Sequence, residues 1–273
     1  NLYFRFGAAQ TMSRPTLQQL APTITQLTIP EGGMTSGATL TIGNPKLSPF
    51  RANNFDAAVE WYYAEGGLIS VALFKKKIGS YPQTVRFAAP LSTFLDAEGL
   101  QSLIEQYGAN SDQAAYIRGD YDATARQFRD APGGELKGWE INYQQAFTFL
   151  PGLLKNTGIQ LNATHIQSEL TYILDPGTDT TPATLGKAPW LGASPNAVNL
   201  TLYYEDKRIN TRVSLAQRDG YYTTYPLVAG ACAPGVIGGV ACDTPLINDF
   251  GGSKDTLNVD FSFSYKLSDR ASF

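Results

Sequence analysis

The chain has 273 residues, of which 16% are charged and 12% aromatic, and its formal net charge is −3. An aromatic-rich, charge-poor composition excludes a disordered chain, and the small negative charge excludes a nucleic-acid binder that relies on bulk positive charge. One His and two Cys leave too few ligands for a zinc or haem site built on these residues, so we expect no cofactor.

Apolar and polar residues alternate along most of the sequence, a period typical of β-strands. The clearest case lies near the C-terminus, where Leu257, Val259 and Phe261 share one parity while Asn258 and Asp260 share the other. The alternation predicts about eight strands, in chain order 2–13, 51–64, 68–79, 138–150, 158–172, 197–206, 209–222 and 255–267. Strands of soluble proteins have ~5–6 residues and membrane-spanning strands ~9–11, so these long strands indicate a bilayer.

Long and short connections alternate between these strands, at about 37, 3, 58, 7, 24, 2 and 32 residues. The short turns are expected at 65–67, 151–157, 207–208 and 268–270. Outer-membrane barrels combine short periplasmic turns with long extracellular loops. The sequence therefore predicts an all-β fold, an antiparallel transmembrane β-barrel, with one short loop helix around 97–107.

The last residues, 271–273, follow a short turn and are expected to begin another strand. An open sheet edge in lipid leaves backbone groups unpaired, so we expect these strands to be a piece of a larger barrel.

A series of short motifs occurs in a fixed order along the chain. They include Asn54-Phe55-Asp56, Glu60-Trp61-Tyr62, Gly138-Trp139-Glu140, Phe149-Leu150-Pro151-Gly152 and Asn162-Ala163-Thr164. Together they resemble the C-terminal barrel half of TonB-dependent outer-membrane receptors, in the expanded proteobacterial branch of that family.

The resemblance implies a barrel of roughly 22 strands around an N-terminal plug, in the outer membrane of a Gram-negative bacterium. Residues 1–273 would be part of one such barrel domain, with the plug and the remaining strands outside this sequence. TonB would then act through the plug region. The expected partners are outer-membrane lipid, TonB and a transported small solute, and no nucleic acid is expected.

The polar parity of the strands is expected to face the lumen. It carries Arg5, Asp56, Glu60, Lys76, Glu140, Asn142, Gln144, Arg212, Arg218 and Asp260. These side chains either line and pair across a wet lumen or against the plug, or form a solute path. Val259 and Phe261 are expected to face lipid, with Asp260 pointing inward.

Aromatic residues of the outer loops are candidates for stacking on a solute, with ordinary loop packing as the alternative. They are Tyr116, Tyr121, Trp190, Tyr221, Tyr222 and Tyr225. His165 lies at apolar parity and is expected to pack rather than bind a metal. Cys232 and Cys242 lie in one outer loop and are expected to form a disulfide, with two free thiols as the alternative.

No set of acid, base and nucleophile emerges, so we expect no enzyme. The favoured hypothesis is TonB-dependent active uptake of a bulky, scarce solute, an oligosaccharide or a ferric siderophore. The alternatives are a passive outer-membrane diffusion porin and a soluble ligand-binding β-sandwich.

Overall fold

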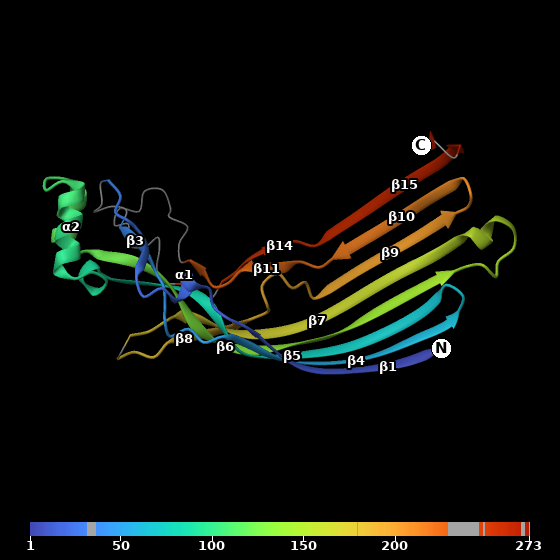
Figure 1. The fold of residues 1–273 in the computed structure, drawn as a ribbon, viewed down its shortest axis with the longest axis horizontal. Coiled ribbons are helices and arrows are strands. Elements are labelled where there is room, and N and C mark those ends of the chain that lie inside the picture. The colour runs from blue at the N-terminus through green and yellow to red at the C-terminus, as the bar shows by residue number, and fades with distance from the viewer. Residues whose placement is uncertain (32–36, 179, 229–245, 248, 269–270, 273) are drawn as a thin grey trace.

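A computed structural model of the chain describes all residues except 32–36, 179, 229–245, 248, 269–270 and 273. Its main feature is one 12-stranded sheet that follows the order β1-β4-β5-β6-β7-β9-β10-β15-β16 (Figure 1). These strands are β1 (Leu2–Ser13), β4 (Phe50–Ala64), β5 (Gly67–Pro90), β6 (Asp122–Ala146), β7 (Thr157–Asp175), β9 (Asn196–Glu205), β10 (Ile209–Arg218), β15 (Thr256–Ser268) and β16 (Ala271–Ser272). Each long strand is antiparallel to its neighbours, which confirms the predicted fold class. In the described residues the sheet is open, with β1 and β16 at its two edges.

The two faces of this sheet differ sharply in chemistry, because the register aligns apolar with apolar and polar with polar residues. One row across the strands holds Phe4, Val59, Val71, Ile141, Ala163 and Val198. We call the face with this row the apolar face and the opposite one the polar face. Phe6 and Phe261 on the apolar face are 83% and 70% exposed. Such large exposed apolar side chains suit contact with lipid rather than water.

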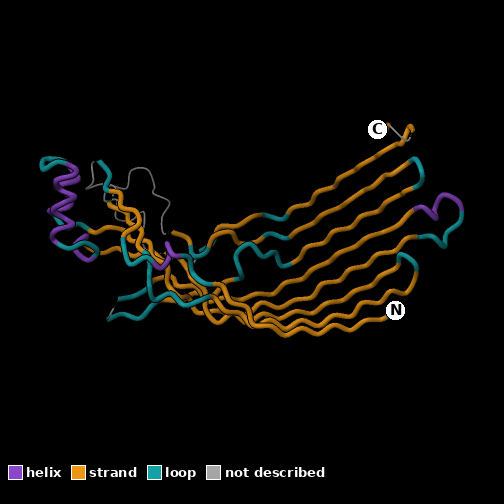
Figure 2. The backbone as a smooth tube through the Cα atoms, viewed as in Figure 1, coloured by secondary structure: helices purple, strands orange, loops and turns teal. Residues whose placement is uncertain are grey.

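The short turns and both chain ends lie at one end of the sheet, and the α-helices lie toward the other (Figures 1 and 2). Between β4 and β5 the chain reverses at Gly66, whose φ of 66° is a conformation that glycine adopts readily. Between β9 and β10, Asp206 Oδ1 accepts backbone N–H groups of Arg208 and Ile209, each at 2.7 Å. These hydrogen bonds lower the pKa of the Asp206 carboxyl.

The strands β5 and β6 are much longer than their predicted ranges of 68–79 and 138–150. They have 24 and 25 residues and stay paired from Leu68–Gln144 to Pro90–Asp122. Two further predictions need correction at strand ends. The range 209–222 is interrupted after Arg218, and β6 stops at Ala146 rather than at 150.

A compact head caps the far end of the β5–β6 hairpin. It contains β2 (Ile24–Thr28), β3 (Ala38–Ile42), the 3₁₀ turn η1 (Leu91–Thr93) and the helices α2 (Ala97–Tyr107) and α3 (Asp112–Arg118). Strand β3 pairs with β2 and runs parallel to the start of β6. The core of the head includes Leu40, Leu91 and Ile117, and the apolar side of α2 packs against it. The predicted helix at 97–107 is confirmed.

The remaining short elements lie in the connections. They are α1 (Leu17–Leu20), the 3₁₀ turn η2 (Gly152–Asn156), β8 (Thr184–Ala188), β11 (Tyr221–Thr224), β12 (Leu227–Val228), β13 (Leu246–Ile247) and β14 (Gly251–Ser253). Strands β11 and β14 form a separate two-stranded sheet directly beyond β10 and β15. Within the described part of the chain, no helix has the length and hydropathy needed to span a bilayer.

Neighbouring residues of β15 test the assignment of the two faces. Phe261 lies on the apolar face opposite Val213, whereas Asp260 lies on the polar face opposite Ser214. A charged side chain at the lipid-facing midplane costs ~2–4 kcal/mol. We expect Phe261→Arg to reduce the amount of folded protein in the membrane more than Asp260→Arg, as measured by heat-modifiable mobility on gels. Equal yields of the two variants would contradict the assignment.

The core of the head is expected to depend on Leu40, which is 1% exposed, and not on Leu17, which is 87% exposed. Truncation of a buried leucine to alanine costs ~2–5 kcal/mol because it leaves a cavity, and an exposed site changes stability by about 0.5 kcal/mol or less. Leu40→Ala should therefore make the head of the folded protein sensitive to added protease. Leu17→Ala is the matched control, and equal cleavage of both would show that the head is not cooperatively packed.

Candidate functional site

The polar face carries a network of side chains that hydrogen bond across neighbouring strands. Arg5 donates to both carboxylate oxygens of Glu60, at 2.8 and 3.1 Å, and Tyr62 donates to Glu60 at 3.3 Å. Further along the sheet, Asn162 Nδ2 donates to Glu140 Oε1 at 2.9 Å and to Asn142 Oδ1 at 2.7 Å. Arg5, Glu60 and Glu140 are thus paired or hydrogen bonded by near neighbours on this face.

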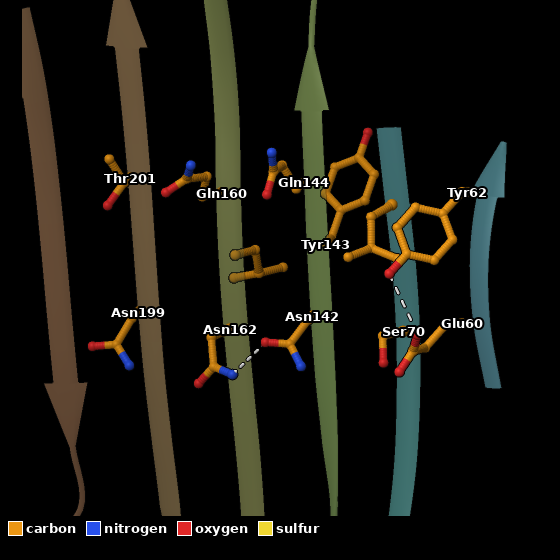
Figure 3. Close-up of a pocket in the computed structure, with 12 residues that line it drawn as sticks. Glu60, Tyr62, Ser70, Asn142, Tyr143, Gln144, Gln160, Asn162, Asn199 and Thr201 are labelled. Atoms are coloured by element: carbon orange, nitrogen blue, oxygen red, sulfur yellow. Dashed lines mark hydrogen bonds between the residues drawn. The ribbon is translucent and has the colours of Figure 1, made fainter. Parts of the chain in front are cut away.

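A shallow hollow of about 500 Å³ lies on this face, lined by residues of β4 to β9 (Figure 3). Its lining is dominated by uncharged polar groups, including Ser70, Asn142, Gln144, Gln160, Asn162, Asn199 and Thr201. The register produces this arrangement, because Asn142 lies opposite Asn162, and Asn162 lies opposite Asn199. Amide side chains offer both donors and acceptors. The surface can therefore hydrogen bond water, a sliding solute or another protein surface without strong attraction to one charge.

A second, more apolar cavity of about 270 Å³ lies beyond β10, at the end of the sheet away from the short turns. It is formed by the β11–β14 pair and the segment before β9, and it includes Pro189, Pro195, Tyr221, Tyr222 and Phe250. The rings of Tyr222 and Phe250 are 4.0 Å apart between centroids. Proline and aromatic side chains bordered by polar groups suit a flat, partly apolar ligand.

Charged groups border this cavity on one side. The Arg218 guanidinium lies 4.1 Å from the centroid of the Tyr221 ring and donates to the Ser194 hydroxyl and, at 2.8 Å, to the Gly192 carbonyl. The Asp219 carboxyl accepts hydrogen bonds from the side chains of Asn196 and Gln217, which lower its pKa. Arg218 is thus held rigidly where the polar face meets the aromatic cavity.

The structure separates the six predicted ligand-stacking aromatics into buried and accessible groups. The prediction is wrong for Tyr116, which is 2% exposed in the core of the head. Its hydroxyl accepts a hydrogen bond from Ala38 N–H and donates one to the Asp122 carbonyl, and burial raises its pKa. It is also wrong for Tyr225, which is 6% exposed and packs edge-on against Tyr172. Both rings lack a free face for a solute.

The other four aromatics occupy three places. Tyr221 and Tyr222 line the apolar cavity and remain predicted ligand contacts. Trp190 packs against the buried cluster around Tyr172. Tyr121 is 43% exposed and lies in the head. Phe250, which completes the cavity, was not among the predicted residues, because its ring is brought to Tyr222 by the β11–β14 pairing rather than by sequence proximity.

The predicted lumen residues share the polar face by register. Arg5, Asp56 and Glu60 belong to the paired strands β1 and β4, Glu140 to β6, Arg212 and Arg218 to β10, and Asp260 to β15. That this face lines a lumen stays a prediction. The neutral amides of β7 and β9 were missed because they do not titrate. Asn142 and Asn162 lie at similar distances before and after the turn at 151–157, which could have indicated that they pair across the two strands.

His165 lies on the apolar face, stacked on Trp139 at 5.8 Å between centroids, with Nδ1 2.7 Å from Asn196 Oδ1. The described residues contain no cluster of three or more His, Cys, Asp or Glu suited to a metal ion. The predicted Cys232–Cys242 disulfide lies outside the described residues.

Comparisons with known proteins relate this fold to outer-membrane receptors. The computed structure overlays on a variant of the ferric enterobactin receptor of Pseudomonas aeruginosa with a TM-score of 0.54 and 16% identity, covering 98% of this chain and 31% of that one. For the siderophore receptor PirA of Acinetobacter baumannii the TM-score is 0.56 and the identity 14%, with 98% and 33% covered.

The chain thus spans about a third of the length of these solved structures, and at such identities the likeness concerns the fold. No curated protein matches the sequence. The family described as TonB dependent receptor-like, beta-barrel matches residues 1–273, so the chain belongs to the TonB-dependent receptor β-barrel family.

Proposed function

We propose that the chain is part of an outer-membrane receptor of a Gram-negative bacterium that takes up a bulky, scarce solute by TonB-dependent active transport. Residues 1–273 would form part of one barrel domain, and TonB would act through a plug that lies outside this sequence. The protein would be a transporter and carry out no covalent chemistry. The observation that carries the proposal is the match of the TonB-dependent receptor β-barrel family over residues 1–273. It is supported by the contact of Arg218, a polar-face residue of β10, with the ring of Tyr221, which lines the aromatic cavity.

In this proposal the two regions have separate tasks. The cavity of Tyr221, Tyr222 and Phe250 captures the solute outside the membrane, where flat rings stack and Arg218 attracts negative charge. The amide-lined hollow then offers exchangeable hydrogen bonds along the sheet. Because these amide groups bind no single charge strongly, they suit the passage of a solute or contact with a moving plug better than tight binding of the solute.

A ferric siderophore is the solute that this cavity favours over an oligosaccharide. Its ferric ion would be cargo, and the aromatic rings and negative charge that many iron chelates carry match Tyr222, Phe250 and Arg218. The two solved structures with a similar fold are named as a ferric enterobactin receptor and a siderophore receptor, which supports the same class. A passive porin remains the competing function, since a polar sheet face suits both.

Uptake measurements distinguish the receptor from a porin. Cells that carry the gene should accumulate iron-55 supplied as a ferric catecholate chelate, and accumulation should cease in a strain without TonB while surface binding persists. Equal accumulation with and without TonB would identify a diffusion pore and refute active transport.

The role of the aromatic cavity is tested by Tyr222→Ala. Loss of one aromatic partner removes ~0.5–1.5 kcal/mol beyond area burial, so we expect surface affinity for the chelate to fall about tenfold. The control is Phe149→Ala, which removes a 71% exposed ring near the short turns at the opposite end of the sheet. Unchanged binding in Tyr222→Ala, with TonB-dependent uptake retained, would reject this cavity as the capture site while leaving the transport function intact.

A further inference from the structure

The apolar face changes character abruptly along β5, β6 and β7. Its last apolar row includes Leu73 and Trp139 and ends at His165. One row further from the short turns, Lys75 lies opposite Lys137, and in the row after that Lys77 lies opposite Glu135. The apolar band therefore ends at a cluster of lysine side chains on the same face of the sheet.

These charges form a defined cluster, which we call the basic patch. It consists of Lys75, Lys77, Lys137 and Lys187 with the carboxylates of Glu135 and Glu169. Lys75 Nζ lies 2.9 Å from Glu135, and Lys187 Nζ lies 2.7 Å from Glu169. Lys77 and Lys137 form no ion pair with any described residue. The patch holds more ammonium groups than carboxylates, and its charges are accessible, since the Lys75 and Lys187 side chains are 43% and 66% exposed.

Glu135 lies near three of these lysines. Glu135 lies beyond the last apolar row, and its pKa is lowered by the hydrogen bond from Lys75 and by the positive charges of Lys137 and Lys77. Only Lys75 forms an ion pair with this carboxylate. Like charges directly opposite each other across strands are destabilising, which applies to Lys75 against Lys137. An additional anion at this point relieves that repulsion.

The position of the patch restricts what that anion is. Immediately beside it lie Phe55 and Leu73, which are 50% and 57% exposed on the apolar face, and Trp139, which is 37% exposed. Trp favours the level of lipid headgroups, and lysines near the end of an apolar segment reach toward the same level. A ligand that satisfies both surfaces has acyl chains for the apolar face and a negative headgroup for the lysines.

We propose that the basic patch binds the phosphate-bearing headgroup of an anionic lipid whose acyl chains lie against Phe55, Leu73 and Trp139. Phosphate has several acceptor oxygens, so it can bind Lys75, Lys77 and Lys137 at once. The lysine side chain is flexible, and its ammonium group binds phosphate as a point charge. Since the patch lies just beyond the apolar band, on the side away from the short turns, this lipid belongs to the outer leaflet. It would anchor β5–β7 at a fixed depth in the membrane.

The test measures lipid retention by the purified receptor. Delipidated receptor in a non-ionic detergent is titrated with dioleoyl phosphatidic acid, and bound lipid is counted by native mass spectrometry. The double variant Lys77→Gln/Lys137→Gln loses two ammonium groups of the patch. Because each lysine near a membrane surface contributes about 1 kcal/mol to the binding of anionic lipid, the affinity should fall about thirtyfold. Lys77→Arg/Lys137→Arg should retain binding, which separates loss of charge from loss of folding.

The matched control removes two positive charges elsewhere. Lys76 lies between Lys75 and Lys77 but on the polar face, and Lys155 lies at the opposite end in η2. Lys76→Gln/Lys155→Gln should bind the lipid like the unmodified receptor. Dioleoyl glycerol, which lacks the phosphate, should bind at least tenfold more weakly, and inorganic phosphate should not displace the lipid.

Three results would overturn the proposal. Equal affinity of Lys77→Gln/Lys137→Gln and of its control would show that the patch does not contact the headgroup. Equal retention of dioleoyl glycerol would reduce the interaction to acyl chains alone. Displacement by inorganic phosphate would turn the patch into a site for a free anion.

Discussion

Backbone pairing between adjacent strands is the constraint on which this structure depends. A strand in lipid has no water to satisfy its N–H and C=O groups, so each must find its partner on the neighbouring strand. The ladder from β1 through β15 meets this demand without a crossover, because each long strand pairs with the next long strand of the chain. Once the ladder is fixed, side chains alternate strictly between the two faces, and every other property of the sheet follows from which residues occupy which parity.

The alternation gives the two faces independent chemistry on one scaffold. A polar-face residue such as Asp260 can change while Val259 and Phe261, one residue away on either side, stay on the apolar face. The same separation explains why Lys76 and its neighbours Lys75 and Lys77 belong to different environments. A shift of one residue in register would exchange the faces along a whole strand, so the ladder protects both functions at once.

The membrane part of the fold was predictable from the sequence, and the part beyond the membrane was not. A strand with lipid on one side and a polar environment on the other must alternate apolar and polar side chains. The sequence ranges predicted for β1, β9 and β15 therefore agree with the structure almost to the residue. Further out, protein covers both sides and alternation loses its meaning. Beyond the predicted ranges, β5 and β6 continue through Gly79 and Pro132, with Ile78 opposite Gly134 and Ser80 opposite Pro132. A side chain at Gly133 would collide with the Ile78 carbonyl, so glycine there permits close contact between the strands rather than ending them.

The candidate sites show the same division. Parity alone placed Arg5, Glu60 and Asp260 on one face, because a single strand carries that information. The ring environments of Tyr116 and Tyr225 depend on long-range packing, as between Tyr116 and β3, which no local pattern encodes. The aromatic cavity likewise needs Phe250 beside Tyr222, two residues joined only through the β11–β14 pairing.

The length of the β5–β6 hairpin has a mechanical consequence. At about 3.3 Å per residue its 24 and 25 residues extend for roughly 80 Å, far beyond what a bilayer requires. Above the apolar band the paired strands β5 and β6 continue and hold the head at a fixed distance from the band. Strand β3 adds to this ladder, because it pairs in parallel with the start of β6. A swing of the head down over the membrane surface would break this ladder. The strand pairing therefore holds the head in place relative to the long hairpin.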